Sequence, residues 1–128
     1  MSDAITLTIP RERPFHTVAH LVLGGLAARL NLTIETFEDL ELALDTLLER
    51  RDGDEPVTLE VRLTDDVIEV SIGPFRSASI RSELEQGNDD ELGLRRVLDT
   101  LAEGVQLEER GDVYWVRMEK SLASLETA

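Results

Sequence analysis

The sequence predicts an α+β protein, a two-layer α/β sandwich in which helices cover one face of a mixed, mostly antiparallel sheet. Alternating apolar residues in "AITLTIP", "VTLEVRL" and "VIEVSI" have the period of strands. Apolar residues recur every three or four positions over 15–30 and 37–48, which is the period of amphipathic helices. "VQLEE", the turn "RGD" and "VYWVRME" predict a closing hairpin. The predicted order is β-α-α-β-β-loop-α-β-β.

The first strand and helix have clear boundary residues. Pro10 follows the strand, and the helix is predicted from Phe15 to Leu30, with Asn31 as its stop. Gly24 and Gly25 lie inside this helix, where each costs about 1 kcal/mol relative to alanine. We therefore expect the helix backbone to pack closely against a neighbour there.

The second helix is predicted to start at the capping residue Thr33. Its expected buried stripe is Phe37, Leu40, Ala43, Leu44, Leu47 and Leu48. A β-hairpin follows, and then a flexible loop over about 73–90 with a short helix from Ile80 to Leu84. The third helix is predicted from Glu91 to Glu103, and residues 121–128 are predicted to form a frayed tail.

Composition narrows the class of protein. A chain of 128 residues predicts one domain over 1–128, with its core at about 4–122. There is no cysteine, which excludes disulfides and thiolate metal sites. The net charge of −14, from 13 basic and 27 acidic side chains, argues against nucleic-acid binding and favours basic partners. The N-terminal residues do not resemble a signal peptide and no stretch could span a membrane, so a cytoplasmic protein is expected.

Two segments resemble motifs of a known family. "FEDLELAL" is similar to the start of an N-box helix, and "LGLRRVLDTLAEGVQLEERGDVYWVRMEKSL" to a last glycine box, helix and closing hairpin. In this order they resemble the anti-sigma-factor serine kinases, a branch of the GHKL ATPases, over residues 4–122. The resemblance implies the histidine-kinase-like ATPase (Bergerat) fold. It also implies an N-box glutamate base, an asparagine for Mg²⁺, an aspartate of a DxG box for adenine and a glycine-rich lid for phosphates.

The residues at those positions depart from the family pattern. Thr46 stands at the position of the base and Arg50 at that of the Mg²⁺ ligand, and neither side chain can replace the one it stands for. The DxG position falls near Ile72 to Pro74, without an acid, and Gly93 of the last box follows two carboxylates. Asp45 and Glu49 flank the base position, but one residue turns a helix by about 100°. The resemblance therefore predicts only vestigial pocket positions: Thr46, Arg50, Pro74 and Gly93.

The two histidines, His16 and His20, have the i, i+4 spacing of metal ligands, but no third ligand accompanies them. The resemblance places a partner-facing residue at His20, which makes it the candidate for partner binding. The alternative is a half-buried helix histidine.

The resulting prediction is a catalytically inactive regulatory module, without a cofactor, in a partner-switching pathway. It would bind a sigma factor or a STAS anti-anti-sigma domain through its first helix and an exposed sheet edge. One alternative is an ATP-dependent serine kinase, or a protein that only binds Mg-ATP, with an atypical pocket. The other is a dimerisation or scaffold module using the small residues Gly24, Gly25, Ala27 and Ala28 of the first helix.

Overall fold

The computed structural model describes residues 3–50, 55–64, 66–76, 80–82, 84 and 94–121. The strands and helices follow the predicted order. They are β1 (Asp3–Ile9), η1 (Arg13–Phe15), α1 (His16–Leu30), α2 (Ile34–Leu48), β2 (Val57–Thr64), β3 (Val67–Phe75), α4 (Leu94–Leu101), β4 (Gly104–Arg110) and β5 (Val113–Ser121).

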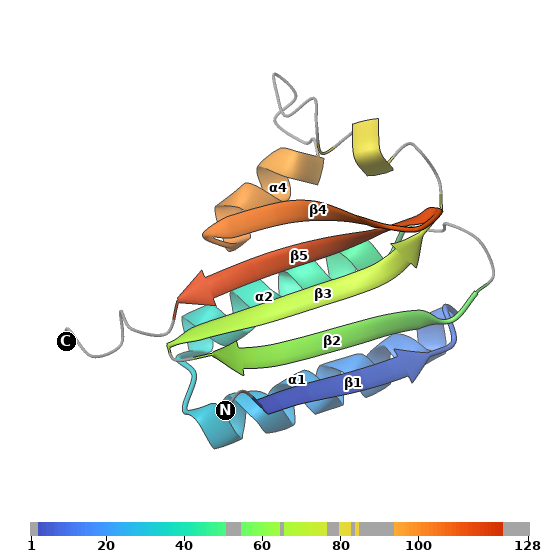
Figure 1. Cartoon of the computed structure of the whole chain (residues 1–128). Coiled ribbons are helices and arrows are strands. Elements are labelled where there is room, and N and C mark those ends of the chain that lie inside the picture. The colour runs from blue at the N-terminus through green and yellow to red at the C-terminus, as the bar shows by residue number, and fades with distance from the viewer. Residues whose placement is uncertain are drawn as a thin grey trace.

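The five strands form one sheet in the order β1-β2-β3-β5-β4 (Figure 1). Every pairing between them is antiparallel, so the expected mixed sheet is an antiparallel one over the described strands. The β2–β3 and β4–β5 pairs are the two predicted hairpins, and Gly111 supplies the positive φ of 65° that the second turn needs.

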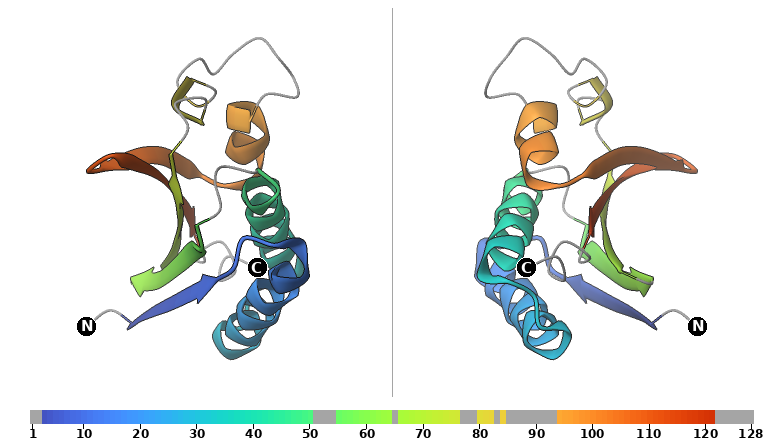
Figure 2. Two further views of the ribbon diagram at one scale, coloured as in Figure 1. Left: turned by 90° about the vertical axis from the view of Figure 1, so that its right-hand side faces the viewer. Right: turned by 90° about the vertical axis from the view of Figure 1, so that its left-hand side faces the viewer.

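Helices α1, α2 and α4 lie on one face of the sheet, and none of the described helices covers the other face (Figure 2). Within the helical layer, α2 lies between α1 and α4 (Figure 2). One hydrophobic core fills the space between the layers, with Leu44 and Leu47 of α2 packed among Ile68, Ile72 and Val116 of the sheet. This confirms the predicted two-layer architecture.

The predicted boundary residues Asn31 and Thr33 are confirmed, whereas α4 ends at Leu101, two residues before the predicted Glu103. Asn31 ends α1 in the left-handed conformation, with φ 55° and ψ 45°. The Thr33 hydroxyl accepts a hydrogen bond from the Thr36 backbone N–H, as an N-cap does. The predicted close packing is confirmed for Gly24, where an added Cβ would lie 3.9 Å from Phe37 of α2. It is wrong for Gly25, where an added Cβ would have no neighbour within 4 Å.

The predicted loop at 73–90 is wrong at its start, because β3 continues through a cis Gly73–Pro74 peptide to Phe75. Phe75 is fully buried, which explains why the strand extends past the apparent Gly-Pro break. Trp115 of β5 packs directly on Gly73, so only glycine fits there: a Cβ would lie 2.6 Å from the ring. The pattern of apolar residues did not reveal this contact because it joins residues 42 positions apart.

Further along, residues 80–82 and 84 are helical, as predicted, and Ile80 and Leu84 are buried. The rest of the predicted loop beyond residue 76, and residues 91–93 of the predicted third helix, lie outside the described residues. Of the predicted tail, Ser121 is the last residue of β5, and 122–128 lie outside the described residues.

Candidate functional site

The outer side of α2 carries the position that the resemblance assigns to a catalytic base. Thr46 is half-buried there, and its hydroxyl donates a hydrogen bond of 2.7 Å to the Leu42 carbonyl oxygen one turn earlier. A threonine hydroxyl that donates a hydrogen bond to its own helix cannot accept a proton as a carboxylate does. The described part of the site thus has no general base at this position.

Asp45, the neighbouring acid that could replace the base, is engaged elsewhere. Its Oδ1 lies 2.6 Å from Nε2 of His20, on α1. Because α1 and α4 lie on opposite sides of α2 (Figure 2), this contact directs the Asp45 carboxylate away from α4. A shift of the alignment by one residue therefore does not supply a base on the α4 side.

His20 joins α1 to α2 through both of its ring nitrogens. Nδ1 lies 2.9 Å from Oε2 of Glu41, and Nε2 contacts Asp45 as described. Partial burial disfavours the charged ring, but the hydrogen bonds and the negative charges of the two carboxylates outweigh it and raise the pKa of His20 above its usual 6.5. Charged His20 donates two hydrogen bonds, so the predicted partner-binding residue is held within this chain's own helix pair.

A shallow hollow of about 260 Å³ separates α2 from α4. The described residues that line it are Leu42, Arg96, Val97, Thr100 and Leu101. Its volume is below the roughly 300–1,000 Å³ of typical small-molecule pockets, and the described residues that line it include no carboxylate. Gly93, which precedes α4, lies outside the described residues.

The remaining two predicted pocket positions, Pro74 and Arg50, lie in different settings. The Pro74 carbonyl oxygen, at the DxG position, accepts a hydrogen bond of 2.6 Å from Nη2 of Arg11. Arg11 also donates from Nε to the Glu55 carbonyl oxygen at 2.9 Å, so it ties the β1–α1 connection to the end of β3. Arg50 follows the last turn of α2, where its backbone N–H donates to the Leu47 carbonyl oxygen at 3.2 Å. No sequence pattern pointed to Arg11, since its partners lie 44 and 63 residues away.

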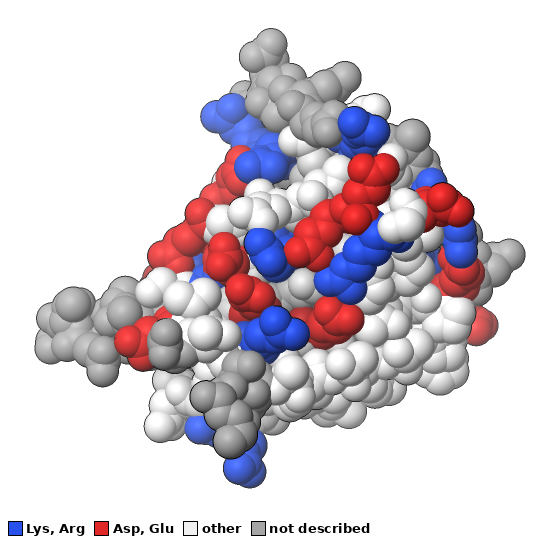
Figure 3. All heavy atoms as spheres, viewed as in Figure 1, with Lys and Arg blue, Asp and Glu red and all other residues white. Residues whose placement is uncertain are grey.

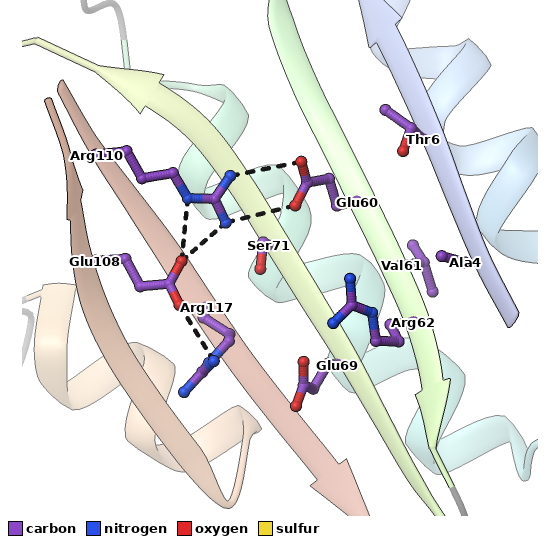
Figure 4. A pocket seen from close by; sticks show the side chains of 10 residues that line it. All are labelled: Ala4, Thr6, Glu60, Val61, Arg62, Glu69, Ser71, Glu108, Arg110 and Arg117. Atoms are coloured by element: carbon purple, nitrogen blue, oxygen red, sulfur yellow. Dashed lines mark hydrogen bonds and ion pairs between the residues drawn. The ribbon is translucent and has the colours of Figure 1, made fainter. Parts of the chain in front are cut away.

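The open face of the sheet carries interleaved acidic and basic side chains (Figure 3). In its centre is a polar hollow of about 200 Å³ (Figure 4), lined by Ala4, Thr6, Glu60, Val61, Arg62, Glu69, Ser71, Glu108, Arg110 and Arg117.

Arg110 makes the central contacts of this hollow, with one aromatic and two acidic side chains. Its guanidinium lies 4.1 Å from the Trp115 ring centroid, 2.8 Å from Glu108 and 3.5 Å from Glu60. Arg117 lies 3.1 Å from the other oxygen of Glu108. Because these charges pair with one another across three strands, the hollow is close to neutral and shows no excess charge that would attract an ion.

Metal binding finds no support in the part of the chain that the structure describes: it contains no group of three or more His, Asp or Glu side chains arranged to hold a metal ion. Among the described residues, His16 and His20 are therefore not joined by a third potential ligand. None of the described helices is long and apolar enough to cross a lipid bilayer.

Comparison with known proteins gives two kinds of similarity, although no family model matches the chain. The curated serine-protein kinases RsbW of Listeria innocua and Listeria monocytogenes are 28% identical over 79 residues, covering 56% of this chain. The chain spans about half the length of these relatives, since the match covers 50% of each. A crystal structure of the RsbU and RsbW domains of a Mycobacterium tuberculosis protein covers 94% of this chain and 32% of its own, with a TM-score of 0.68 and 12% identity.

The chain therefore shares its fold, a five-stranded antiparallel sheet with helices on one face, with part of that Mycobacterium tuberculosis structure. The Listeria sequences support the resemblance seen in the motifs: this chain is similar to the RsbW serine-protein kinases over about half of its length.

Proposed function

We propose that this chain is a regulatory protein-binding module of a sigma-factor partner-switching pathway, and that it does not transfer phosphate. The observation that carries the proposal is the base position, where Thr46 is bonded to its own helix. Asp45, the nearest acid, is held by His20 on the α1 side. Transfer of phosphate to a serine hydroxyl needs a group that accepts or orients its proton.

The Mg²⁺ and adenine positions support the same proposal. Arg50 offers only hydrogen-bond donors, which cannot coordinate Mg²⁺. At the DxG position, the Pro74 carbonyl oxygen is already occupied by Arg11. A protein that keeps the family scaffold without these groups can still present its helices to a sigma factor or a STAS domain.

The alternative is an ATP-dependent serine kinase with an atypical pocket. It is favoured by the relatives from Listeria, which are named serine-protein kinases. In that case, residues other than Thr46 and Asp45 would supply the base.

A paired assay separates the two functions. The purified chain is first melted with and without millimolar Mg-ATP or Mg-ADP, with the Listeria innocua kinase as the positive control. A ligand at 100 times its Kd stabilises a protein by about 2.7 kcal/mol, a shift that thermal melting detects readily. The chain is then incubated with Mg-ATP and a STAS domain, and phosphoserine is measured by mass spectrometry.

We expect no nucleotide-dependent shift and no phosphoserine, together with measurable binding to a sigma factor or STAS domain. A Mg²⁺-dependent shift accompanied by phosphoserine would overturn the proposal and establish the kinase. Absence of binding to any such domain would instead refute the regulatory role.

A further inference from the structure

An exposed apolar row runs along the outer side of α1. It consists of Val18, Leu21, Gly25 and Ala28, at intervals of three, four and three residues, so its members share one face of the helix. Leu21 is 70% exposed and Val18 is 38% exposed. No atom lies within 4 Å of a Cβ built on Gly25, so the row has open space beside Leu21.

This row is unusual because α1 is apolar on two sides. Its inner side already fills the core with Ala19 and Leu23. A surface helix normally presents charged and polar residues to solvent, and an exposed apolar patch commonly marks a contact surface.

An acidic row runs along α2 beside it. It consists of Glu38, Glu41, Asp45 and Glu49, again at intervals of three and four residues. Residues 34–49 contain six acidic side chains and no lysine or arginine. Glu38 and Glu49 are exposed, and Glu41 and Asp45 are half-buried.

His20 joins the two rows. It adjoins Leu21 in the chain, and its ring contacts Glu41 and Asp45 at 2.9 and 2.6 Å. One turn further along α1, Gly24 lies next to Phe37 of α2. The apolar row and the acidic row are therefore the two sides of one surface on the helix pair.

We propose that this surface, the α1–α2 surface, docks an amphipathic basic α-helix of a partner protein. Leucine-like side chains of that helix pack on Val18 and Leu21 and into the space over Gly25. Its lysines and arginines face Glu38 and Glu49 at the ends of the acidic row. This inference rests on the proposed protein-binding function and adds where the partner binds and what chemistry it has.

The negative charge of the α1–α2 surface favours a basic helix over other possible partners. A second copy of this chain would bring a second acidic row and a further net charge of −14 to the same surface. A nucleic acid would bring phosphates, which the acidic row repels. A basic amphipathic helix is favoured by both rows. Charge complementarity with the acidic row speeds its association, and its apolar side covers Leu21.

The test uses three labelled helical peptides of equal length that differ in the pattern or the charge of their residues. The first has leucines at i, i+3, i+7 and i+10 with lysine and arginine elsewhere, the second has the same composition scrambled, and the third has glutamate in place of the basic residues. Fluorescence anisotropy gives Kd for each, and amide NMR shifts locate the contact. A sigma factor and a STAS domain are titrated in parallel.

The variants are Leu21→Asp for the apolar row and Glu49→Lys for the acidic row, with Leu42→Asp as the matched control. Leu42 is 53% exposed, but it lines the hollow toward α4. Circular dichroism checks that each variant is folded, and Glu49→Lys leaves the apolar row intact.

We expect only the first peptide to bind, with shifts confined to residues of α1 and α2. Leu21→Asp and Glu49→Lys should each weaken it about tenfold or more, Leu42→Asp less than about twofold, and added salt should weaken it further. Equal binding of the scrambled or acidic peptide, unchanged binding by Leu21→Asp, or self-association of the chain through α1 would overturn the inference. If a sigma factor or STAS domain binds wild type and Leu21→Asp equally, the inference fails while the proposed function stands; if wild type binds none of the probes, both fail.

Discussion

Replacing His20 by alanine should cost stability in a pH-dependent manner. A hydrogen bond to a charged group contributes about 1.5–3 kcal/mol when it is shielded from water. The Glu41 and Asp45 side chains are 28% and 40% exposed, so solvent screening reduces this to about 1 kcal/mol for each bond. The expected loss for His20→Ala is therefore about 2 kcal/mol at pH 5.5.

The sign of the pH dependence follows from the raised pKa of His20. Between the unfolded and folded pKa values the folded protein binds more protons than the unfolded one, so stability falls as pH rises. The contribution is fully present below about 6.5, the unfolded value, and is lost as pH rises through the folded pKa. The gap between wild type and His20→Ala should therefore narrow from pH 5.5 to pH 9.

Urea unfolding of both proteins at several pH values measures this gap. Asp45→Asn should lose part of the same pH dependence, because it removes one of the two charges that raise the pKa. Glu38→Gln, an exposed acid on the same helix, is the control and should leave the dependence unchanged. A gap that stays constant across this pH range would refute the reasoning.

Four further substitutions test packing and helix capping, each measured by chemical denaturation. Gly73→Ala should cost about 1–3 kcal/mol, because its Cβ would lie 2.6 Å from Trp115, whereas Gly25→Ala should be neutral or stabilise by up to about 1 kcal/mol; equal effects would contradict the assigned contacts. Phe75→Ala should cost about 3–5 kcal/mol, and a loss below about 1 kcal/mol would mean that β3 ends before this residue. Thr33→Ala should cost about 1 kcal/mol, and no loss would argue that the cap contributes nothing.

The sequence by itself determined the local structure of this protein. The strands of both hairpins, the start of α2 at Thr33 and the end of α1 at Asn31 follow from residues close together in the chain. Periodicity and capping are local properties, so they can be read without knowing the fold. The threonine at the position that the resemblance assigns to the base was also visible in the sequence, because it is a matter of residue identity at an aligned position.

Only the tertiary structure decided which side chains meet. Asp45 could have pointed toward either neighbouring helix, and its contact with His20, 25 residues earlier, places it on the α1 side. β3 continues beyond a Gly-Pro pair that reads as a loop, because Phe75 is buried in the core, and Trp115 of β5 packs on Gly73. Arg11 reached Pro74 across 63 residues. Such contacts depend on how the layers pack, and no short-range pattern encodes them.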